Sequence, residues 1–171
     1  MNSPRLYLFV GYPGAGKTTI AKLIHEKTGA IHLWADHERH VLFEEVTHSK
    51  AESQELYTRL NAEADALLAA GKSVIFDTNF NFRADRDHLR DIARKHGAET
   101  LVIWVKTPRE LAQKRAVEES HDQDTRIWGN MPAKSFERLA NNLQPPDDNE
   151  NFITIDGTDI DPDAVLAQLG I

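Results

Sequence analysis

Five short apolar runs alternate along the chain with longer segments in which apolar residues recur every three or four positions. The apolar runs are residues 6–10, 31–34, 74–77, 101–105 and 152–155. Runs of this length are typical of buried strands, whereas the three-to-four spacing is typical of helices. The helices expected between and after the strands cover residues 17–28, a short segment from about 36, 51–70, 83–96, the segments opened by Pro108 and Pro132, and 163–169.

Glycines mark the ends of several expected helices. Gly29, Gly71 and Gly97 each follow a helical segment directly, which is where a C-terminal glycine commonly stands. The regular alternation of strand and helix predicts an α/β fold with three layers, in which helices cover both faces of a five-stranded, mainly parallel sheet. At 171 residues the chain is expected to form one domain, residues 1–171.

The turn after the first apolar run carries the most informative motif. Residues 11–18 read Gly-Tyr-Pro-Gly-Ala-Gly-Lys-Thr and match the phosphate-loop pattern G-x-x-x-x-G-K-[ST] at every fixed position. The motif lies between a strand and a helix, where backbone N–H groups surround a polyphosphate. We therefore predict a P-loop NTPase fold that binds ATP and Mg²⁺.

Each residue type in the loop has a chemical reason. Lys17 is expected to reach the outer phosphates and act in catalysis, and the Thr18 hydroxyl to ligate Mg²⁺. The residues expected to bind the nucleotide are Gly11, Pro13, Gly14, Ala15, Gly16, Lys17, Thr18, Thr19 and Arg115. The alternative, a glycine-rich turn that binds nothing, is disfavoured because the motif and its strand–helix setting agree.

Composition excludes some classes of protein. The chain has no cysteine, so it has neither a disulfide framework nor a thiolate metal site. The net charge of −7 argues against a broad nucleic-acid surface, which is usually basic. No apolar run approaches membrane-spanning length and no signal peptide is recognisable, so we expect a cytoplasmic protein with no membrane contact and no obligate protein partner.

Polar residues after the second strand suggest an acceptor site. Asp36 and Arg39 are three residues apart and share a face of a helical turn. Asp36 is predicted to be the catalytic base that takes a proton from a substrate hydroxyl, and Arg39 to bind an anionic group of the substrate. In the alternative interpretation, Asp36 only caps a helix and Arg39 lies on the surface.

A second acidic position follows the third strand. Asp77 ends an apolar strand, which is the usual place for a residue that orients the Mg²⁺ shell, and it is predicted as a metal and substrate residue. An unpaired buried carboxylate is energetically costly, which favours a functional role. Thr78 and Asn79 are predicted to contact the substrate; turn and capping chemistry is the alternative.

The segment 118–131 has no clear period and is expected to form a short lid. A lid that closes over the nucleotide excludes water, and an arginine in it can stabilise charge on the γ-phosphate. Arg115 and Arg126 are the candidates for that arginine; either can instead be a solvated surface residue.

With these residues in view, the chain resembles the small P-loop kinases of the polynucleotide-kinase and zeta-toxin group. The nearest match is the kinase domain of phage-type polynucleotide 5′-hydroxyl kinases. The resemblance covers nearly the whole chain and is carried by residues 11–19, Asp36 with Arg39, 74–81, 136–146 and 153–157. It implies that Asp36 is the general base and that Arg39 binds the substrate's phosphate or the transition state. It also implies a catalytic lid arginine, for which Arg126 aligns best and Arg115 is the second choice.

The predicted function is therefore ATP-dependent transfer of the γ-phosphate to a hydroxyl, which belongs either to a nucleic acid 5′ end or to a small molecule. The lid residues 118–124 are acidic and polar, where a nucleic-acid kinase is expected to be more basic. The alternatives are a non-catalytic ATP-binding regulatory module and a small NTPase. A regulatory GTPase is disfavoured because no N-K-x-D segment is present.

Two other groups of residues invite a functional interpretation. His37 and His40 are able to share a helix face, but the sequence lacks a third convincing metal ligand there. Trp34 and Trp104 lie in strand patterns and are expected in the core, whereas Trp128 lies in the expected lid.

Overall fold

The structure, a computed structural model, describes residues 2–119, 125 and 129–171. Its strands are β1 (Arg5–Val10), β2 (Ile31–Trp34), β3 (Val74–Asp77), β4 (Glu99–Lys106) and β5 (Phe152–Asp156). Each predicted strand is present, and β4 extends beyond the apolar run at both ends because Glu99 and Lys106 continue the hydrogen-bonded ladder.

The strands form one sheet in the order β2-β3-β1-β4-β5. Every neighbouring pair is parallel, with Tyr7 of β1 opposite Ile75 of β3 and Leu101 of β4. The chain passes from β1 to β2 on one side and from β3 to β4 on the other. Ligands bind at such a switch point, outside the carboxyl ends of the two strands, here β1 and β3.

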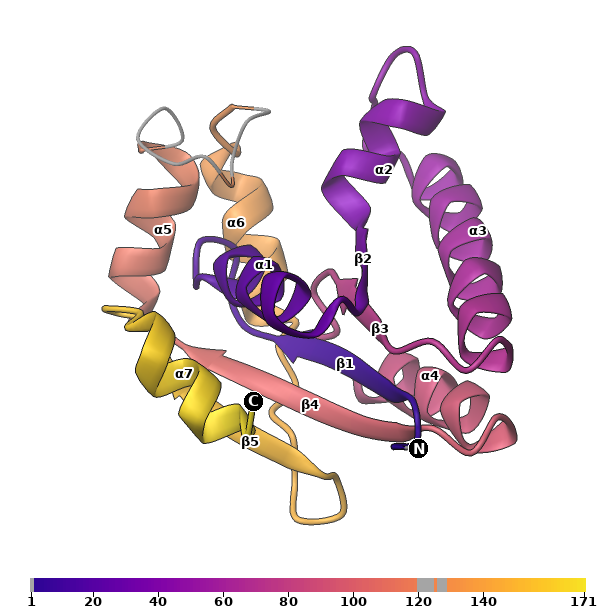
Figure 1. Cartoon of the computed structure of the whole chain (residues 1–171). Helices are drawn as coiled ribbons and strands as arrows, with labels where there is room; N and C mark the ends of the chain where they lie inside the picture. Colours follow the sequence, from indigo (N-terminus) through magenta and orange to yellow (C-terminus); the bar gives the residue numbers. More distant parts are fainter. Residues whose placement is uncertain (1, 120–124, 126–128) are drawn as a thin grey trace.

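The helices cover both faces of the sheet (Figure 1). They are α1 (Lys17–Thr28), α2 (Ala35–Leu42), α3 (Lys50–Ala69), α4 (Arg83–Lys95), α5 (Arg109–Val117), α6 (Ala133–Asn141) and α7 (Pro162–Leu169). Each corresponds to a predicted helix. The three-layer α/β fold is therefore confirmed.

A separate hydrophobic cluster lies on each face of the sheet. Alternate residues of β1 point to opposite sides, so Leu6, Leu8 and Val10 pack with α3 and α4, while Tyr7 and Phe9 pack with α1 and α7. All but Tyr7 are fully buried. A fully buried large apolar side chain contributes about 1.5–3 kcal/mol, so the sheet centre is the stable frame that positions the loops.

A third cluster lies beyond the carboxyl ends of the strands. Ala112 and Ala116 of α5 pack against Phe136 and Ala140 of α6, with Tyr12 of the phosphate loop at their edge. In Figure 1, α5 and α6 rise on one side of the strand ends and α2 with the start of α3 rises on the other. These two helix pairs form walls around the phosphate loop.

A buried ionic cluster fixes α4 to the segment before β5. Arg86 is fully buried; its Nε and Nη2 donate to Glu150 at 2.8 and 3.0 Å, and its Nη1 donates to the Phe80 carbonyl at 2.7 Å. Arg90 Nη2 donates to Glu150 at 2.6 Å. The cluster therefore holds the segment after β3 in place, which is where the predicted substrate residues lie.

Candidate nucleotide and acceptor site

The phosphate loop is shaped by glycines that no other residue can replace without strain. Gly14 and Gly16 have φ of +81° and +113°, in the left-handed region. A Cβ on Gly14 would lie 2.3 Å from the carbonyl oxygen of Ala112, and one on Gly16 would lie 2.7 Å from Ile160 Cδ1. The loop therefore follows its curve only because these positions lack side chains.

The loop ends at an uncapped helix N-terminus. Gly16 is the N-cap of α1, no side chain caps the helix, and its first turn contains no acidic residue. The first N–H groups of a helix have no intrahelical partner and, with the helix dipole, favour an anion. Lys17 Nζ lies over the same loop and donates to the carbonyls of Gly11 at 3.1 Å and Tyr12 at 2.7 Å. The arrangement suits a polyphosphate.

Residues distant in sequence hold the loop from behind. The amide of Asn81 pairs reciprocally with Gly11: its Oδ1 accepts from the Gly11 N–H at 3.1 Å and its Nδ2 donates to the Gly11 carbonyl at 3.2 Å. Thr107 Oγ1 donates to the Ala15 carbonyl at 2.8 Å. A Cβ on Gly157 would lie 2.1 Å from that same carbonyl oxygen.

These supporting residues are additions to the predicted set. Asn81 and Gly157 lie within the stretches that carry the family resemblance, and Thr107 lies in the turn after β4. Their partners are 70 and 92 positions away along the chain for Asn81 and Thr107. Local sequence pattern marks them as turn residues but does not identify those partners.

A cavity of about 840 Å³ opens in front of the loop, between the two helix walls. Most predicted site residues line this cavity. They are Pro13, Gly14, Gly16, Lys17, Thr18, Thr19, Asp36, Arg39, Asp77, Thr78, Asn79 and Arg115. Gly11 and Ala15 lie behind this surface, in contact with Asn81 and Thr107. One cavity thus joins the phosphate loop to the predicted acceptor residues.

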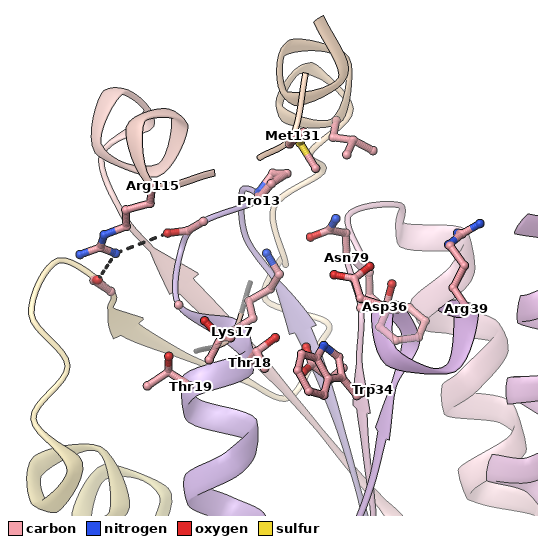
Figure 2. Close-up of a pocket in the computed structure, with 18 of the residues that line it drawn as sticks. Pro13, Lys17, Thr18, Thr19, Trp34, Asp36, Arg39, Asn79, Arg115 and Met131 are labelled. Carbon is pink, nitrogen blue, oxygen red and sulfur yellow. Dashed lines mark hydrogen bonds between the residues drawn. The ribbon is translucent and has the colours of Figure 1, made fainter. Parts of the chain in front are cut away.

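Asp36 stands on the acceptor side of this cavity. It is exposed, lies in the first turn of α2, and in Figure 2 its carboxylate is directed toward the space in front of Lys17 and Thr18. The N-cap of α2 is Trp34, not Asp36, so the capping alternative for Asp36 is wrong. Helix geometry leaves the Asp36 side chain available to a ligand.

Arg39 also lines the cavity, but its charge is compensated. It is buried, its Nη1 donates to Glu52 Oε1 at 2.6 Å and its Nη2 donates to Ser53 Oγ at 3.2 Å. Hydrogen bonds from the Thr47 backbone, Arg39 and the Thr47 side chain outweigh burial and lower the pKa of Glu52 to about 2. The surface alternative for Arg39 is therefore wrong, and its binding to an anionic substrate group stays a prediction.

Asp77 is buried at the end of β3 and lines the cavity. Its Oδ2 lies 2.9 Å from Nε2 of His32 on the neighbouring strand β2. The expectation of an unpaired carboxylate is wrong, because the parallel pairing of β2 with β3 brings His32 beside Asp77. Its role toward Mg²⁺ stays a prediction.

Arg115 lies at the edge of the phosphate loop. Its Nη1 donates to the carbonyls of Gly157 at 2.8 Å and Gly14 at 3.4 Å, and its Nη2 donates to Thr158 at 2.7 Å (Figure 2). Arg115 thus ties α5 to the phosphate loop and to the loop before α7. Arg126, Trp128 and most of the expected lid 118–131 lie outside the described residues, although Glu119, Thr125 and Met131 line the cavity.

Of the two tryptophans expected in the core, Trp104 packs against the main buried cluster, whereas Trp34 lies at the cavity. Trp34 is partly buried and lines the cavity, stacked between the rings of His32 and His37 at centroid distances of 5.9 and 5.8 Å. β2 is an edge strand, so no further strand covers its outer side. Trp104 is only partly buried and packs against Phe152.

Within the part of the chain that the structure describes, no group of three His, Cys, Asp or Glu residues is placed to hold a metal ion.

Comparison with known proteins gives the class. The sequence profile of an AAA domain family (AAA_33) matches residues 6–146, and the chain belongs to this family. A protein from Pyrococcus abyssi (strain GE5 / Orsay) with a provisional adenylate kinase name is 24% identical over 164 residues, covering 96% of this chain and 81% of that protein.

Solved structures share the fold. A provisionally named kinase from Chloroflexus aurantiacus J-10-fl superposes with a TM-score of 0.78 at 20% identity, covering 99% of this chain and 98% of that one. The Mycobacterium tuberculosis APS kinase CysC, solved in complex with AMPPNP and APS, has a TM-score of 0.67 at 19% identity, covering 99% of this chain and 96% of that one. The chain thus shares the fold of these kinases.

The subgroup is less defined than the class. A chain of the Pnkp1/Rnl/Hen1 RNA repair complex has a TM-score of 0.67 at 23% identity, but the match covers 84% of this chain and 45% of that one. The resemblance to P-loop kinases is confirmed, whereas the polynucleotide-kinase subgroup stays a prediction. No helix in the described ranges has both the length and the apolar character needed to cross a bilayer.

Proposed function

We propose that the chain is an ATP-dependent kinase that transfers the γ-phosphate of ATP to a hydroxyl. The observation that carries this proposal is the exposed carboxylate of Asp36, which shares one cavity with Lys17 and Thr18 of the phosphate loop. A nucleotide site alone needs no carboxylate in that position. The cavity volume of about 840 Å³ lies within the range of roughly 300–1,000 Å³ that is usual for small-molecule sites.

In this proposal the phosphate loop binds the triphosphate and Asp36 acts on the acceptor. The acceptor hydroxyl gives its proton to the Asp36 carboxylate while its oxygen bonds to the γ-phosphorus. The bond from that phosphorus to the bridging oxygen breaks, and ADP leaves. Lys17, and a lid arginine for which Arg126 is the candidate, stabilise charge on the transferring group.

The residues present fit a Mg²⁺ ion. Thr18 and Asp77 line the same cavity and offer a hydroxyl and a carboxylate oxygen, the ligand types that Mg²⁺ prefers. A bound ion would neutralise charge on the β- and γ-phosphates. The hydrogen bond to His32 holds the Asp77 carboxylate beside the loop, and second-shell partners of this kind orient metal ligands.

Replacing Asp36 with Asn tests the proposal. Because Asn is nearly isosteric but a poor base, ATP affinity should stay near the unmodified value while turnover falls on the order of a hundredfold. Turnover is measured as ADP release in the presence of an acceptor panel, and ATP affinity by calorimetry. Asp91→Asn is a matched control, since that exposed carboxylate on α4 pairs with Arg94 and does not line the cavity.

Two results would contradict the proposal in different ways. Unchanged turnover in Asp36→Asn would remove Asp36 as the base. If ATP binds but no hydroxyl compound stimulates ADP release, the chain is an ATP-binding module. A nucleoside monophosphate phosphorylated on its phosphate group would instead place the chain with kinases whose acceptor is a phosphate.

A further inference from the structure

The acceptor side of the cavity contains an arginine whose charge is compensated by a neighbouring carboxylate. Arg39 and Glu52 have side chains that are 7% and 6% exposed and are joined at 2.6 Å. Glu52 is itself held by three further bonds, from Thr47 N at 2.7 Å, Thr47 Oγ1 at 2.8 Å and His48 N at 3.2 Å. A substrate phosphate or carboxylate at Arg39 would compete with Glu52 for the guanidinium and would be repelled by the Glu52 charge.

Glu52 remains ionised under any physiological condition, because its pKa is about 2. The α2–α3 connection fixes it further: Ser49 caps α3 by accepting from Glu52 N at 3.2 Å, so backbone and side chain of Glu52 both belong to the helix start. The Glu52 carboxylate thus already compensates the Arg39 charge that would attract an anionic substrate group.

Asn79 lies in the same cavity and has a side-chain oxygen without a hydrogen-bond donor among the described residues. This oxygen, Oδ1, is buried. Leaving a buried polar atom unsatisfied is energetically costly, so the position favours a ligand that supplies a donor. Figure 2 shows Asn79 directed into the same space as Asp36.

Asp36 and Asn79 Oδ1 both accept hydrogen bonds. Hydroxyl and amino groups donate to such atoms, whereas an ionised phosphate or carboxylate only accepts and is repelled by Asp36. Two acceptors that line one cavity suit a molecule with at least two donor groups near the reacting hydroxyl. Tyr57 and Thr78, which share a 2.7 Å hydrogen bond, add neutral hydroxyl groups to the same wall.

We propose that the phosphate acceptor is an uncharged or amino-bearing polyhydroxylated molecule, such as a sugar or polyol, with no phosphate or carboxylate in the part that enters the cavity. This rests on the kinase function proposed above. Glu52 sets the specificity by compensating Arg39, and Asn79 receives a second hydroxyl or amino group of the acceptor.

Binding is tested apart from turnover. With the phosphate loop saturated by AMPPNP, ribose and ribose 5-phosphate are titrated into the full chain by calorimetry, as are glucose and glucose 6-phosphate. The unphosphorylated member of each pair should bind at least tenfold more tightly. Tighter binding of the phosphorylated members would overturn the proposal.

Glu52→Gln supplies the gain-of-function test. Removing the Glu52 charge leaves Arg39 buried and uncompensated, which favours an external anion. The affinity for ribose 5-phosphate should rise at least tenfold over the unmodified chain, while the affinity for ribose changes less than threefold. No gain in a variant that melts cooperatively would overturn the role of Glu52. The titration of the unmodified chain decides the acceptor class even if this variant does not fold.

Asn79→Leu tests the second contact. It should weaken binding of the unphosphorylated acceptor at least tenfold and leave AMPPNP affinity within twofold; Asn79→Asp, which keeps an acceptor oxygen, should retain binding. Equal acceptor binding in Asn79→Leu and the unmodified chain would remove Asn79 from the site. If acceptors bind as expected but ADP release is not stimulated, the proposed kinase function fails while the binding specificity stands.

Discussion

The reciprocal bonds between Asn81 and Gly11 are expected to determine the stability of the phosphate loop. Asn81 is 3% exposed, and its amide satisfies both the N–H and the carbonyl of Gly11. Asn81→Leu keeps the side-chain size but leaves the Gly11 N–H buried without a partner, while the Gly11 carbonyl keeps its hydrogen bond from Lys17 Nζ. An unsatisfied buried group costs about 1–3 kcal/mol, so the free energy of unfolding should fall by about 1–3 kcal/mol.

The expected change in melting temperature follows from chain length. For a domain of 150–250 residues, 1 kcal/mol corresponds to about 2–4 °C, so Asn81→Leu should melt roughly 2–12 °C lower. Urea unfolding gives the free energy and calorimetry the melting temperature. Because Gly11 opens the phosphate loop, affinity for AMPPNP should fall as well.

Asn79→Leu is the matched control, since it makes the same substitution two residues away. Asn79 Oδ1 has no partner among the described residues, so its removal should be neutral or stabilising. The two variants therefore test whether a satisfied and an unsatisfied buried amide differ as hydrogen-bond accounting requires. Equal stability of Asn81→Leu and the unmodified chain, within about 0.5 kcal/mol, would refute the reasoning, because distant surface substitutions have effects of that size.

Two further predictions concern the loop and the ionic cluster. Gly14→Ala should lower stability by about 1–3 kcal/mol and weaken AMPPNP binding at least tenfold, because the new Cβ would lie 2.3 Å from a backbone oxygen of α5. Gly29→Ala is its control: φ there is also positive, at +71°, but no atom lies within 4 Å of the added Cβ, so melting should change while AMPPNP titration does not. Burial raises the pKa of Glu150, but the hydrogen bonds and charges of Arg86 and Arg90 outweigh it and lower that pKa from 4.5 to about 2. The ionised form is thus stabilised on folding, so the stability advantage over Glu150→Gln should be constant above about pH 5 and shrink from pH 4.5 toward pH 2; a gap in urea-unfolding free energy that does not change with pH would contradict it.

Local pattern predicted the elements because it contains their physical causes. The helix Lys17–Thr28 has its predicted bounds, since Gly16 and Gly29 at its ends adopt the left-handed conformations that glycine allows. The apolar runs became strands because residues without polar side chains are covered on both faces of a parallel sheet. The polar residues at the strand ends met in one cavity because parallel strands end at the same edge.

Side-chain contacts across the sheet and between the two helix walls could not be predicted from the local sequence pattern. In the structure Asp77 pairs with His32 and Arg39 pairs with Glu52. Arg115 donates hydrogen bonds to carbonyls of two loops. Trp34 is the last residue of the edge strand β2 and lines the cavity at the strand ends. Strand order and helix packing decide such neighbours, and neither is encoded in the spacing of residues along one segment.

The sequence by itself determined the class of chemistry, because a phosphate loop is a contiguous motif whose glycines, lysine and threonine each act through their own backbone or side chain. Only the tertiary structure decided the state of the groups opposite that loop. Whether an arginine is available to an anion depends on the carboxylate beside it, and Glu52 reaches Arg39 only because α2 packs against α3. Charge compensation and burial are properties of contacts between segments, and they arise only when the chain folds.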